Sequence, residues 1–286
     1  MNAQNWYHTS GVNEPRSAHH LRQNAHRPAR VAVFGSFMGG YHVLCELLFG
    51  ELAEGVRVVG VATDDPTQSY TNAKVRLWKY PHTPEDETLV RRFATSQQLP
   101  VFTGRAKSPE FHELLINEWK PDVCLMATYG QKIPGHIIQV PRRGFYNFHH
   151  SGPTWPSYPG PDPIAAMVRD GRKDLVLTMH KVSDVIDDGE FIARSQPVAI
   201  PPGVNAIDMH RITWPQMHKF IRKAVSDIFD ADEARSNGTD SGVMHEEAVP
   251  YFTGKRPIGN FRARNPQRHF MARSGRQGIA RSCAPP

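Results

Sequence analysis

The chain has 286 residues, of which 39% are hydrophobic and 22% charged, a composition typical of a soluble globular protein. No apolar run reaches 18 residues, and the first thirty residues are polar and lack the apolar core of a signal peptide. The sequence therefore predicts no membrane span and a cytoplasmic location. Three widely separated cysteines exclude a disulfide framework and a Cys-x-x-Cys metal site, and Cys45 and Cys124 lie in apolar segments typical of a core.

The net charge of +6 comes from the two ends of the sequence. Residues 255–286 contain eight Lys or Arg and no acid, and residues 1–30 contain four Arg and one Glu, which leaves −5 for residues 31–254. An acidic centre does not favour a folded groove for nucleic acid. We expect one folded domain at 30–235 between poorly ordered tails at 1–29 and 236–286, although basic tails could also contact RNA or an acidic partner.

The first half of the sequence alternates strands with helices. Strands are expected at 30–35, 56–63, 99–102 and 123–127, a turn at 36–40, and helices at 41–48, 85–97 and 108–119. Ser108 is a candidate N-cap, with Pro109 at the first helical position. The nearly continuous apolar strands predict a mostly parallel sheet covered on both faces. This is a Rossmann-like α/β fold, in which ligands bind beyond the carboxyl ends of the strands.

The pattern changes after Tyr146. Five prolines make residues 151–163 a long rigid loop, and such loops are often functional. The segments that follow are a helix at 163–170, strands at 175–182 and 190–198, and one long helix at 205–234. We find no internal repeat.

Three residues have side chains suited to chemistry at a carbonyl group. On an extended backbone, Asn147 and His149 point to the same face. An amide donor beside an imidazole suits a developing oxyanion, and a nearby acid such as Asp187 would stabilise an imidazolium or accept a proton. Taken singly, these signals also fit a strand-end cap and an ordinary Asp-x-Gly turn.

The order of the surrounding motifs is more specific. The motifs are Ala127-Thr128-Tyr129-Gly130-Gln131-Lys132-Ile133-Pro134, Asn147-x-His149-x-Ser151, Tyr158-Pro159-Gly160, and Thr178-x-His180 followed by Asp187-Asp188-Gly189. Over about residues 30–220 this order resembles the folate-dependent formyltransferases that act on methionyl-tRNA, glycinamide ribonucleotide or amino sugars. The resemblance implies a three-layer formyltransferase domain. It also selects Asp187 rather than Asp184 or Asp188, because seven positions separate it from His180.

The resemblance further implies the residues of the site. Asn147, His149 and Asp187 are the expected catalytic residues, and 10-formyltetrahydrofolate is the expected formyl donor. The loop 183–187 and the segment 129–133 would bind the folate through Tyr129, Gly130, Gln131, Lys132, Ile133, Val185 and Ile186. Tyr129 and Ile133 fit core packing equally well, and His180 is expected to be architectural.

The amine acceptor is the least determined part of the prediction. The expected acceptor-binding residues are Ser36, Phe37, Met38, Gly39, His150 and Trp155. The chain departs from the family pattern at Ser36–Gly40 and from His150 onward, so His150 and Trp155 either line an altered acceptor site or pack the loop. No metal site is expected, because the remaining histidines lack metal-ligand spacing.

The tail after the last predicted helix shows no pattern for a tRNA-binding β-barrel, which favours a small-molecule amine over nucleic acid. The segment around Ser36–Gly40, after the first predicted strand, and the loop after His149 look most like those of enzymes that formylate N5-hydroxyornithine in siderophore biosynthesis. Amino-sugar and methionyl-tRNA formylation are alternatives. A formyl-folate hydrolase and a non-catalytic folate-binding protein also remain open, and the sequence does not indicate the oligomeric state.

Overall fold

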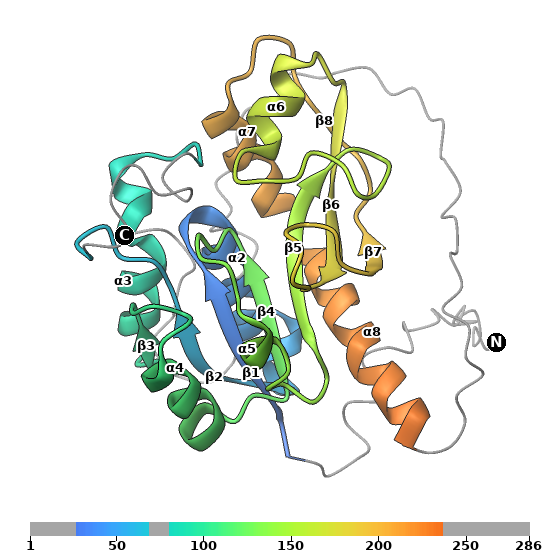
Figure 1. Ribbon diagram of the computed structural model, residues 1–286. Helices are drawn as coiled ribbons and strands as arrows, with labels where there is room; N and C mark the ends of the chain where they lie inside the picture. The colour runs from blue at the N-terminus through green and yellow to red at the C-terminus, as the bar shows by residue number, and fades with distance from the viewer. Residues whose placement is uncertain (1–26, 69–79, 237–286) are drawn as a thin grey trace, which may run out of the picture. The chain divides into compact units, whose positions relative to one another are not determined.

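The computed structural model describes residues 27–68 and 80–236, which form an α/β fold around one mixed sheet (Figure 1). Its strands are β1 (Ala29–Gly35), β2 (Val56–Ala62), β3 (Val101–Phe102), β4 (Val123–Ala127), β5 (Phe145–Ser151), β6 (Asp174–Lys181), β7 (Phe191–Arg194) and β8 (Val198–Ala199). The order is β3-β2-β1-β4-β5-β6-β7, with β8 also pairing to β6. The strands β1 to β5 are parallel, and β6 then runs antiparallel to β5.

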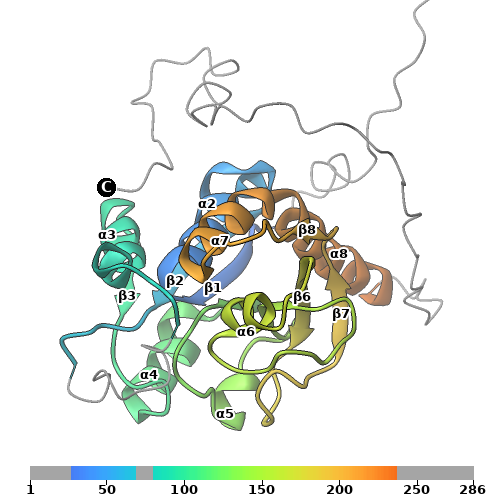
Figure 2. The same cartoon turned by 90° about the horizontal axis from the view of Figure 1, so that it is seen from above.

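Helices cover the sheet. The α-helices are α2 (Phe37–Phe49), α3 (Leu89–Ser96), α4 (Pro109–Glu113), α5 (Gly135–Ile138), α6 (Pro163–Arg169), α7 (Ala206–Thr213) and α8 (His218–Ser236). Short 3-10 or π turns are η1 (Glu51–Glu54), η4 (Pro84–Thr88), η5 (Leu114–Trp119) and η6 (Trp214–Gln216). Figure 2 shows α4 and α5 on one side of the sheet, with α2 and α8 on the other. The predicted mostly parallel α/β fold is therefore confirmed.

Each layer is held by apolar side chains from alternate strand positions. On the α4 side, Phe34 of β1 packs against Phe111 and Phe145, with ring centroids 5.6 and 4.7 Å away. On the α8 side, Phe148 of β5 contacts Phe220 edge-on. Phe145 and Phe148 thus bury opposite faces of β5, as the two-residue repeat of a strand requires.

The end of β4 creates the opening that the site occupies. The last pair between β4 and β5 is Ala127 with Phe148, so residues 149–151 of β5 continue beyond β4 and pair only with β6. A free strand edge at the carboxyl ends of parallel strands is the place where open α/β sheets bind ligands. Side chains from both faces of β5 can approach this opening.

Several predicted elements are confirmed. The expected strand at 123–127 matches β4, and Ser108 caps α4 by accepting a hydrogen bond from the amide of Phe111 at 3.2 Å. Cys45 and Cys124 are both buried.

Other expectations were wrong in detail. The expected turn at 36–40 is the first turn of α2. The single helix expected at 205–234 is broken at Trp214 and Pro215, because proline lacks the N–H that continues a helix. The strand expected at 190–198 is divided into β7 and β8, with Pro197 between them, since proline cannot donate to a ladder. The helices expected at 85–97 and 108–119 include the irregular turns η4 and η5.

The predicted tails lie almost entirely outside the described residues, so the domain limits at 30 and 235 stay a prediction. Within the described part of the chain, no helix is both long enough and apolar enough to cross a membrane.

Candidate active site

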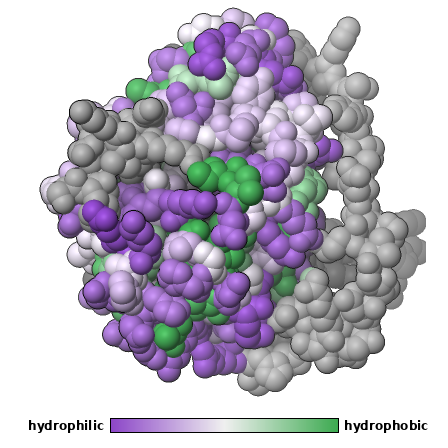
Figure 3. Space-filling model, in the orientation of Figure 1, coloured by the Kyte–Doolittle hydropathy of each residue, from purple (hydrophilic) through white to green (hydrophobic). Residues whose placement is uncertain are grey.

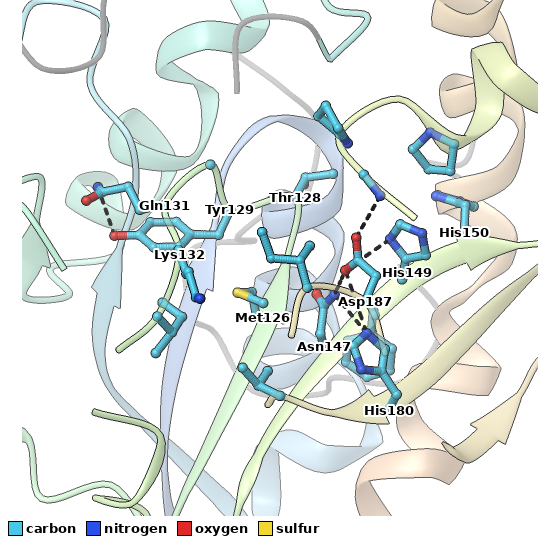
Figure 4. Close-up of a pocket in the computed structure, with 18 of the residues that line it drawn as sticks. Met126, Thr128, Tyr129, Gln131, Lys132, Asn147, His149, His150, His180 and Asp187 are labelled. Carbon is cyan, nitrogen blue, oxygen red and sulfur yellow. Dashed lines mark hydrogen bonds and ion pairs between the residues drawn. The ribbon is translucent and has the colours of Figure 1, made fainter. Parts of the chain in front are cut away.

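A cavity opens at the carboxyl ends of β4 and β5 (Figure 4). Four segments supply most of its walls: the segment after β4, the exposed end of β5, the proline-rich loop and the loop after β6; Tyr80, before η4, adds to them. The lining residues are Tyr80, Met126, Thr128, Tyr129, Gly130, Gln131, Lys132, Ile133, Asn147, Phe148, His149, His150, Gly160, Pro161, Pro163, His180, Val182, Ser183, Val185, Ile186 and Asp187. The molecular face in Figure 3 is mainly hydrophilic with a small hydrophobic patch near its centre.

The strand β5 carries Asn147 and His149 on the face that also carries Phe145, and the loop after β6 brings Asp187 to them (Figure 4). The Nδ2 atom of Asn147 lies 3.3 Å from Oδ1 of Asp187, and Nδ1 of His149 lies 3.7 Å from the same oxygen. All three side chains line the cavity, so an amide, an imidazole and a carboxylate converge on one point.

His180 joins this group through the sheet register. It lies opposite Asn147 in the β5–β6 ladder, and its Nε2 is 3.1 Å from Nδ2 of Asn147. Its Nδ1 lies 2.8 Å from the carbonyl of Lys181, which only accepts, so Nδ1 carries the hydrogen and Nε2 accepts from Asn147. Burial lowers the pKa of His180 to about 4 and keeps this ring neutral. The neutral ring therefore fixes which way the Asn147 amide points.

The positions of His149 and Asp187 are set by the proline-rich loop. The Nε2 of His149 donates to the carbonyl of Tyr158 at 2.9 Å, which directs Nδ1 toward Asp187. The second carboxylate oxygen of Asp187 accepts from the amide of Gly160 at 2.8 Å. Asp187 has a φ of +53°, a conformation that Asp tolerates better than most residues. A Cβ on Gly189 would lie 1.8 Å from the carbonyl oxygen of Lys181, so the loop requires glycine there.

The side chain of Asp64 positions the segment that follows β4. It is buried at the end of β2 and accepts from Ser36 Oγ at 2.8 Å, from the Gly130 amide at 2.9 Å and from Gln131 Nε2 at 3.2 Å. Burial raises the pKa of Asp64, although these hydrogen bonds oppose the rise. The carboxyl group thus ties the ends of β1 and β2 to a wall of the cavity.

The comparisons with known proteins agree with this geometry. A sequence profile of the formyl transferase family matches residues 29–225. The chain belongs to this family. It is 29% identical over 177 residues to a methionyl-tRNA formyltransferase of Syntrophomonas wolfei, covering 62% of this chain and 52% of that protein. It is also 25% identical to the methionyl-tRNA formyltransferase of Thermotoga maritima, over 58% of this chain and 49% of that protein. This chain spans about half the length of the curated relatives that it matches.

Solved structures of the family share the fold. Glycinamide ribonucleotide transformylase 1 from Geobacillus kaustophilus matches with a TM-score of 0.53 and 21% identity, over 71% of this chain and 99% of that one. A formyltetrahydrofolate deformylase from Pseudomonas syringae pv. tomato matches with a TM-score of 0.53 and 19% identity, over 72% of this chain and 63% of that one. At these identities the likeness concerns the fold alone.

The residues expected to bind folate all line the cavity. They come from two segments, Tyr129 to Ile133 and Val185 to Ile186. Ile133 also belongs to the buried core, and Tyr129 packs edge-on against Phe34, so these two residues serve the core and the cavity together. Val185 and Ile186 are 60% and 42% exposed, which is unusual for large apolar side chains.

The residues expected to bind the acceptor are divided. His150 lines the cavity, whereas Ser36, Phe37, Met38 and Gly39 do not. The first turn of α2 lies behind Thr128, whose hydroxyl donates to the carbonyl of Ser36 at 2.6 Å. Trp155 is also absent from the lining, because its ring packs on His180 and its Nε1 donates to the carbonyl of Gly189. Of the two alternatives given for Trp155, packing of the loop is therefore the one that the structure has.

Several lining residues were missed from the sequence. The proline-rich loop was identified as functional, but no pattern assigned Gly160, Pro161 or Pro163 to the cavity wall. The contact of His180 with Asn147 follows from the strand register, which the motif Thr178-x-His180 only hints at. Within the described residues, no group of three or more His, Cys, Asp or Glu side chains is arranged to hold a metal ion.

Proposed function

We propose that this chain transfers a formyl group from 10-formyltetrahydrofolate to an amine. The observation that carries the proposal is the convergence of Asn147, His149 and Asp187 at one carboxylate oxygen in the wall of the cavity. Membership of the formyl transferase family supports the reaction class. The three side chains supply a hydrogen-bond donor, a proton carrier and an acid at the place where a carbonyl group would react.

The folate would lie between segment 129–133 and the loop 182–187. Exposed Val185 and Ile186 offer apolar cover for a flat ring system, and the backbone groups of both segments offer donors and acceptors for its polar edge. This arrangement would present the formyl carbon to Asn147 and His149.

The chemistry then needs one bond formed and one broken. The acceptor nitrogen attacks the formyl carbon, and the carbonyl electron pair moves to oxygen. Asn147 Nδ2 exchanges its long 3.3 Å bond to Asp187 for a bond to this oxyanion, and His149, with Nδ1 3.7 Å from the same Asp187 oxygen, can relay the proton of the attacking amine. Asp187 accepts the proton lost by the amine, directly or through water. Collapse of the oxyanion breaks the bond to the folate N10, which takes up a proton as tetrahydrofolate leaves.

The first candidate acceptor is proposed to be a small amine, either N5-hydroxyornithine, an intermediate of siderophore biosynthesis, or an amino sugar. The support is the departure from the family pattern from His150 onward, beside the three catalytic residues. Methionyl-tRNA is the second candidate, because the curated relatives described above are named for it. The chain spans about half of those relatives, so the similarity does not extend to their remaining length.

The experiment is an acceptor screen with purified chain and 10-formyltetrahydrofolate. N5-hydroxyornithine, a nucleotide-linked amino sugar, glycinamide ribonucleotide and charged initiator methionyl-tRNA are each added, and formylated product is measured by mass spectrometry. We expect formylation of a small amine. Formylation of the tRNA alone would replace the first candidate by the second. Formate release that needs no amine would establish a hydrolase, and tight folate binding without either product would contradict an enzymatic role.

A further inference from the structure

The exposed end of β5 has two faces, and the proposed reaction uses one of them. Asn147 and His149 point to the α4 side, whereas Phe148 and His150 point to the α8 side. Because β4 ends opposite Phe148, the cavity reaches around this free edge and is lined by His149 and His150 together. Figure 4 shows His150 beyond His149, on the side away from Tyr129 and Gln131. Tyr129 and Gln131, from one of the proposed folate-binding segments, thus lie at the other end of the cavity from His150.

The second face of β5 is surrounded by rings. The imidazole of His150 lies 4.7 Å from the Trp214 ring and 5.5 Å from the His210 ring, measured between centroids. Tyr80, which also lines the cavity, stands over His210 at 4.3 Å. His150, His210, Tyr80 and Trp214 are called the ring cluster below. Its members are all buried, although they come from the end of β5, from α7, from η6 and from the segment before η4.

A chain of hydrogen bonds determines one tautomer in the ring cluster. The indole N–H of Trp214 can only donate, and it lies 3.4 Å from the Tyr80 hydroxyl. That hydroxyl in turn lies 2.7 Å from Nδ1 of His210. If Tyr80 accepts from Trp214 and donates to His210, every group is paired, and Nε2 of His210 carries the remaining hydrogen. This Nε2 is a buried donor.

Two nitrogens of the cluster have no partner among the described residues. They are Nε2 of His210 and Nε2 of His150. A buried polar atom without a hydrogen bond costs about 1–3 kcal/mol, so two of them in adjacent rings mark a place where a partner is expected. Of the two rings, His150 lines the cavity and His210 does not, so a partner from the cavity would meet His150.

The chemistry of the cluster selects a neutral partner. Burial lowers the pKa of His150 well below its ordinary value and that of His210 to about 3, so both rings stay uncharged. The lining residues Tyr80, His150, Gly160, Pro161 and Pro163 carry no charged side chain, and the carboxylate of Asp187 that bonds to the Gly160 amide would repel an anion. Neutral N–H groups in an aromatic enclosure bind a hydroxyl or carbonyl oxygen and offer no countercharge to a carboxylate or phosphate.

We propose that His150, supported by His210, Tyr80 and Trp214, forms a subsite that binds a neutral oxygen of the amine acceptor. The inference rests on the proposed formyl transfer, since the folate would fill the opposite end of the cavity and leave this end to the acceptor. Two sources supply such an oxygen beside an amine, namely the hydroxyl of a hydroxylamine and a ring hydroxyl of an amino sugar.

The test uses pairs of amines that differ in their hydroxyl groups. N5-hydroxyornithine is compared with ornithine, and glucosamine with cyclohexylamine, each titrated into the full ¹⁵N-labelled chain. The imidazole resonances of His150 and His210 are followed by NMR and assigned with His150→Phe and His210→Phe. We expect these resonances to shift with at least one oxygen-bearing amine and not with its partner. A shift with N5-hydroxyornithine alone indicates the hydroxylamine, and a shift with glucosamine alone indicates the sugar.

Kinetics supply a second measurement. In His150→Phe, KM for the oxygen-bearing amine should rise about tenfold, the effect of losing one hydrogen bond, with a smaller change in kcat. The control His112→Phe changes a histidine outside the cavity and should leave KM unchanged. Thermal unfolding and folate-analogue binding verify that the variants are folded, and His150→Asn keeps an N–H should the phenylalanine variant not fold.

The subsite would be overturned if the resonances never move. It would also be overturned if ornithine and cyclohexylamine move them as much as N5-hydroxyornithine and glucosamine do. The two proposals fail in different ways. Shifts without formylation by the wild type contradict formyl transfer, whereas formylation without shifts contradicts only the subsite.

Discussion

His149 and His150 are neighbours in the chain, yet they lie in opposite environments. Nδ1 of His149 is 3.7 Å from a carboxylate oxygen of Asp187, and its Nε2 donates to the carbonyl of Tyr158. His150 is enclosed by rings, and its Nε2 has no partner among the described residues. The difference teaches that the face of the strand, more than the residue type, decides what surrounds a histidine: one ring faces a carboxylate, and the other is buried among rings, where burial lowers its pKa.

The largest expected effect is on the His149 side of this comparison. Asn147→Ala and Asp187→Ala should each lower kcat for formyl transfer by roughly 100-fold or more, because each removes a group that acts on the oxyanion or the amine proton. Steady-state kinetics at saturating folate measure the loss. Asn117→Ala, which changes an exposed asparagine in η5, is the matched control. Turnover near the wild-type level in either site variant would sink the catalytic assignment.

Two buried histidines, one on each side of β5, predict a loss of stability in acid. The pKa is lowered to about 4 in His180 and to about 3 in His210, against 6.5 when unfolded. The unfolded chain therefore binds more protons below pH 6.5, and the free energy of unfolding falls as the pH drops from 6.5 toward these folded-state pKa values. At pH 5 each such histidine should cost about 2 kcal/mol relative to pH 7.

Urea unfolding at pH 7 and pH 5 measures this difference. At pH 5 a carboxyl group of ordinary pKa is still ionised, so the histidines dominate the change. His210→Phe should show a smaller loss between the two pH values than the wild type. Equal losses in the two proteins would contradict the assignment of a buried, neutral His210.

Asp64 tests whether the folate end is organised separately from the acceptor end. Asp64→Ala removes the acceptor of the Gly130 amide and of Gln131 Nε2, so segment 129–133 should loosen. We expect KM for the folate to rise about tenfold, with little change in KM for the amine. Asp64→Asn keeps one carbonyl oxygen and should recover part of the folate affinity. If the Asp64→Ala variant raises only the KM for the amine, Asp64 organises the acceptor part of the site and not the folate part.

The smallest effect concerns the packing of Gly39 against Thr128 and Trp214. A Cβ on Gly39 would lie 2.3 Å from Thr128 Oγ1 and 2.8 Å from the Trp214 ring. Overpacking by about 2 kcal/mol, offset by about 1 kcal/mol of improved helix propensity, should leave Gly39→Ala destabilised by about 1 kcal/mol. Gly135→Ala, with its nearest contact at an ordinary 3.6 Å, is the control in thermal unfolding. Equal melting temperatures in the two variants would show that Trp214 has room to move.

Local patterns were sufficient for most of the parallel part of the fold. Continuous apolar runs predicted β1, β2 and β4, because such strands are buried on both faces. Prolines were harder to interpret. Pro215 and Pro197 each interrupt an element that apolar periodicity alone had extended, and the periodicity gave no sign of where the break would fall.

What the sequence determined by itself is a set of candidate residues and their order: Asn147 and His149 two positions apart, Asp187 seven positions after His180, and the segment after β4 that is proposed to bind folate. Tertiary structure decided the rest. It alone aligned His180 with Asn147 across an antiparallel register, ended β4 opposite Phe148, and gathered His150, His210, Tyr80 and Trp214 into one cluster. The physical reason is that strand alternation assigns a side chain to a face from local sequence, whereas what covers that face comes from segments far along the chain.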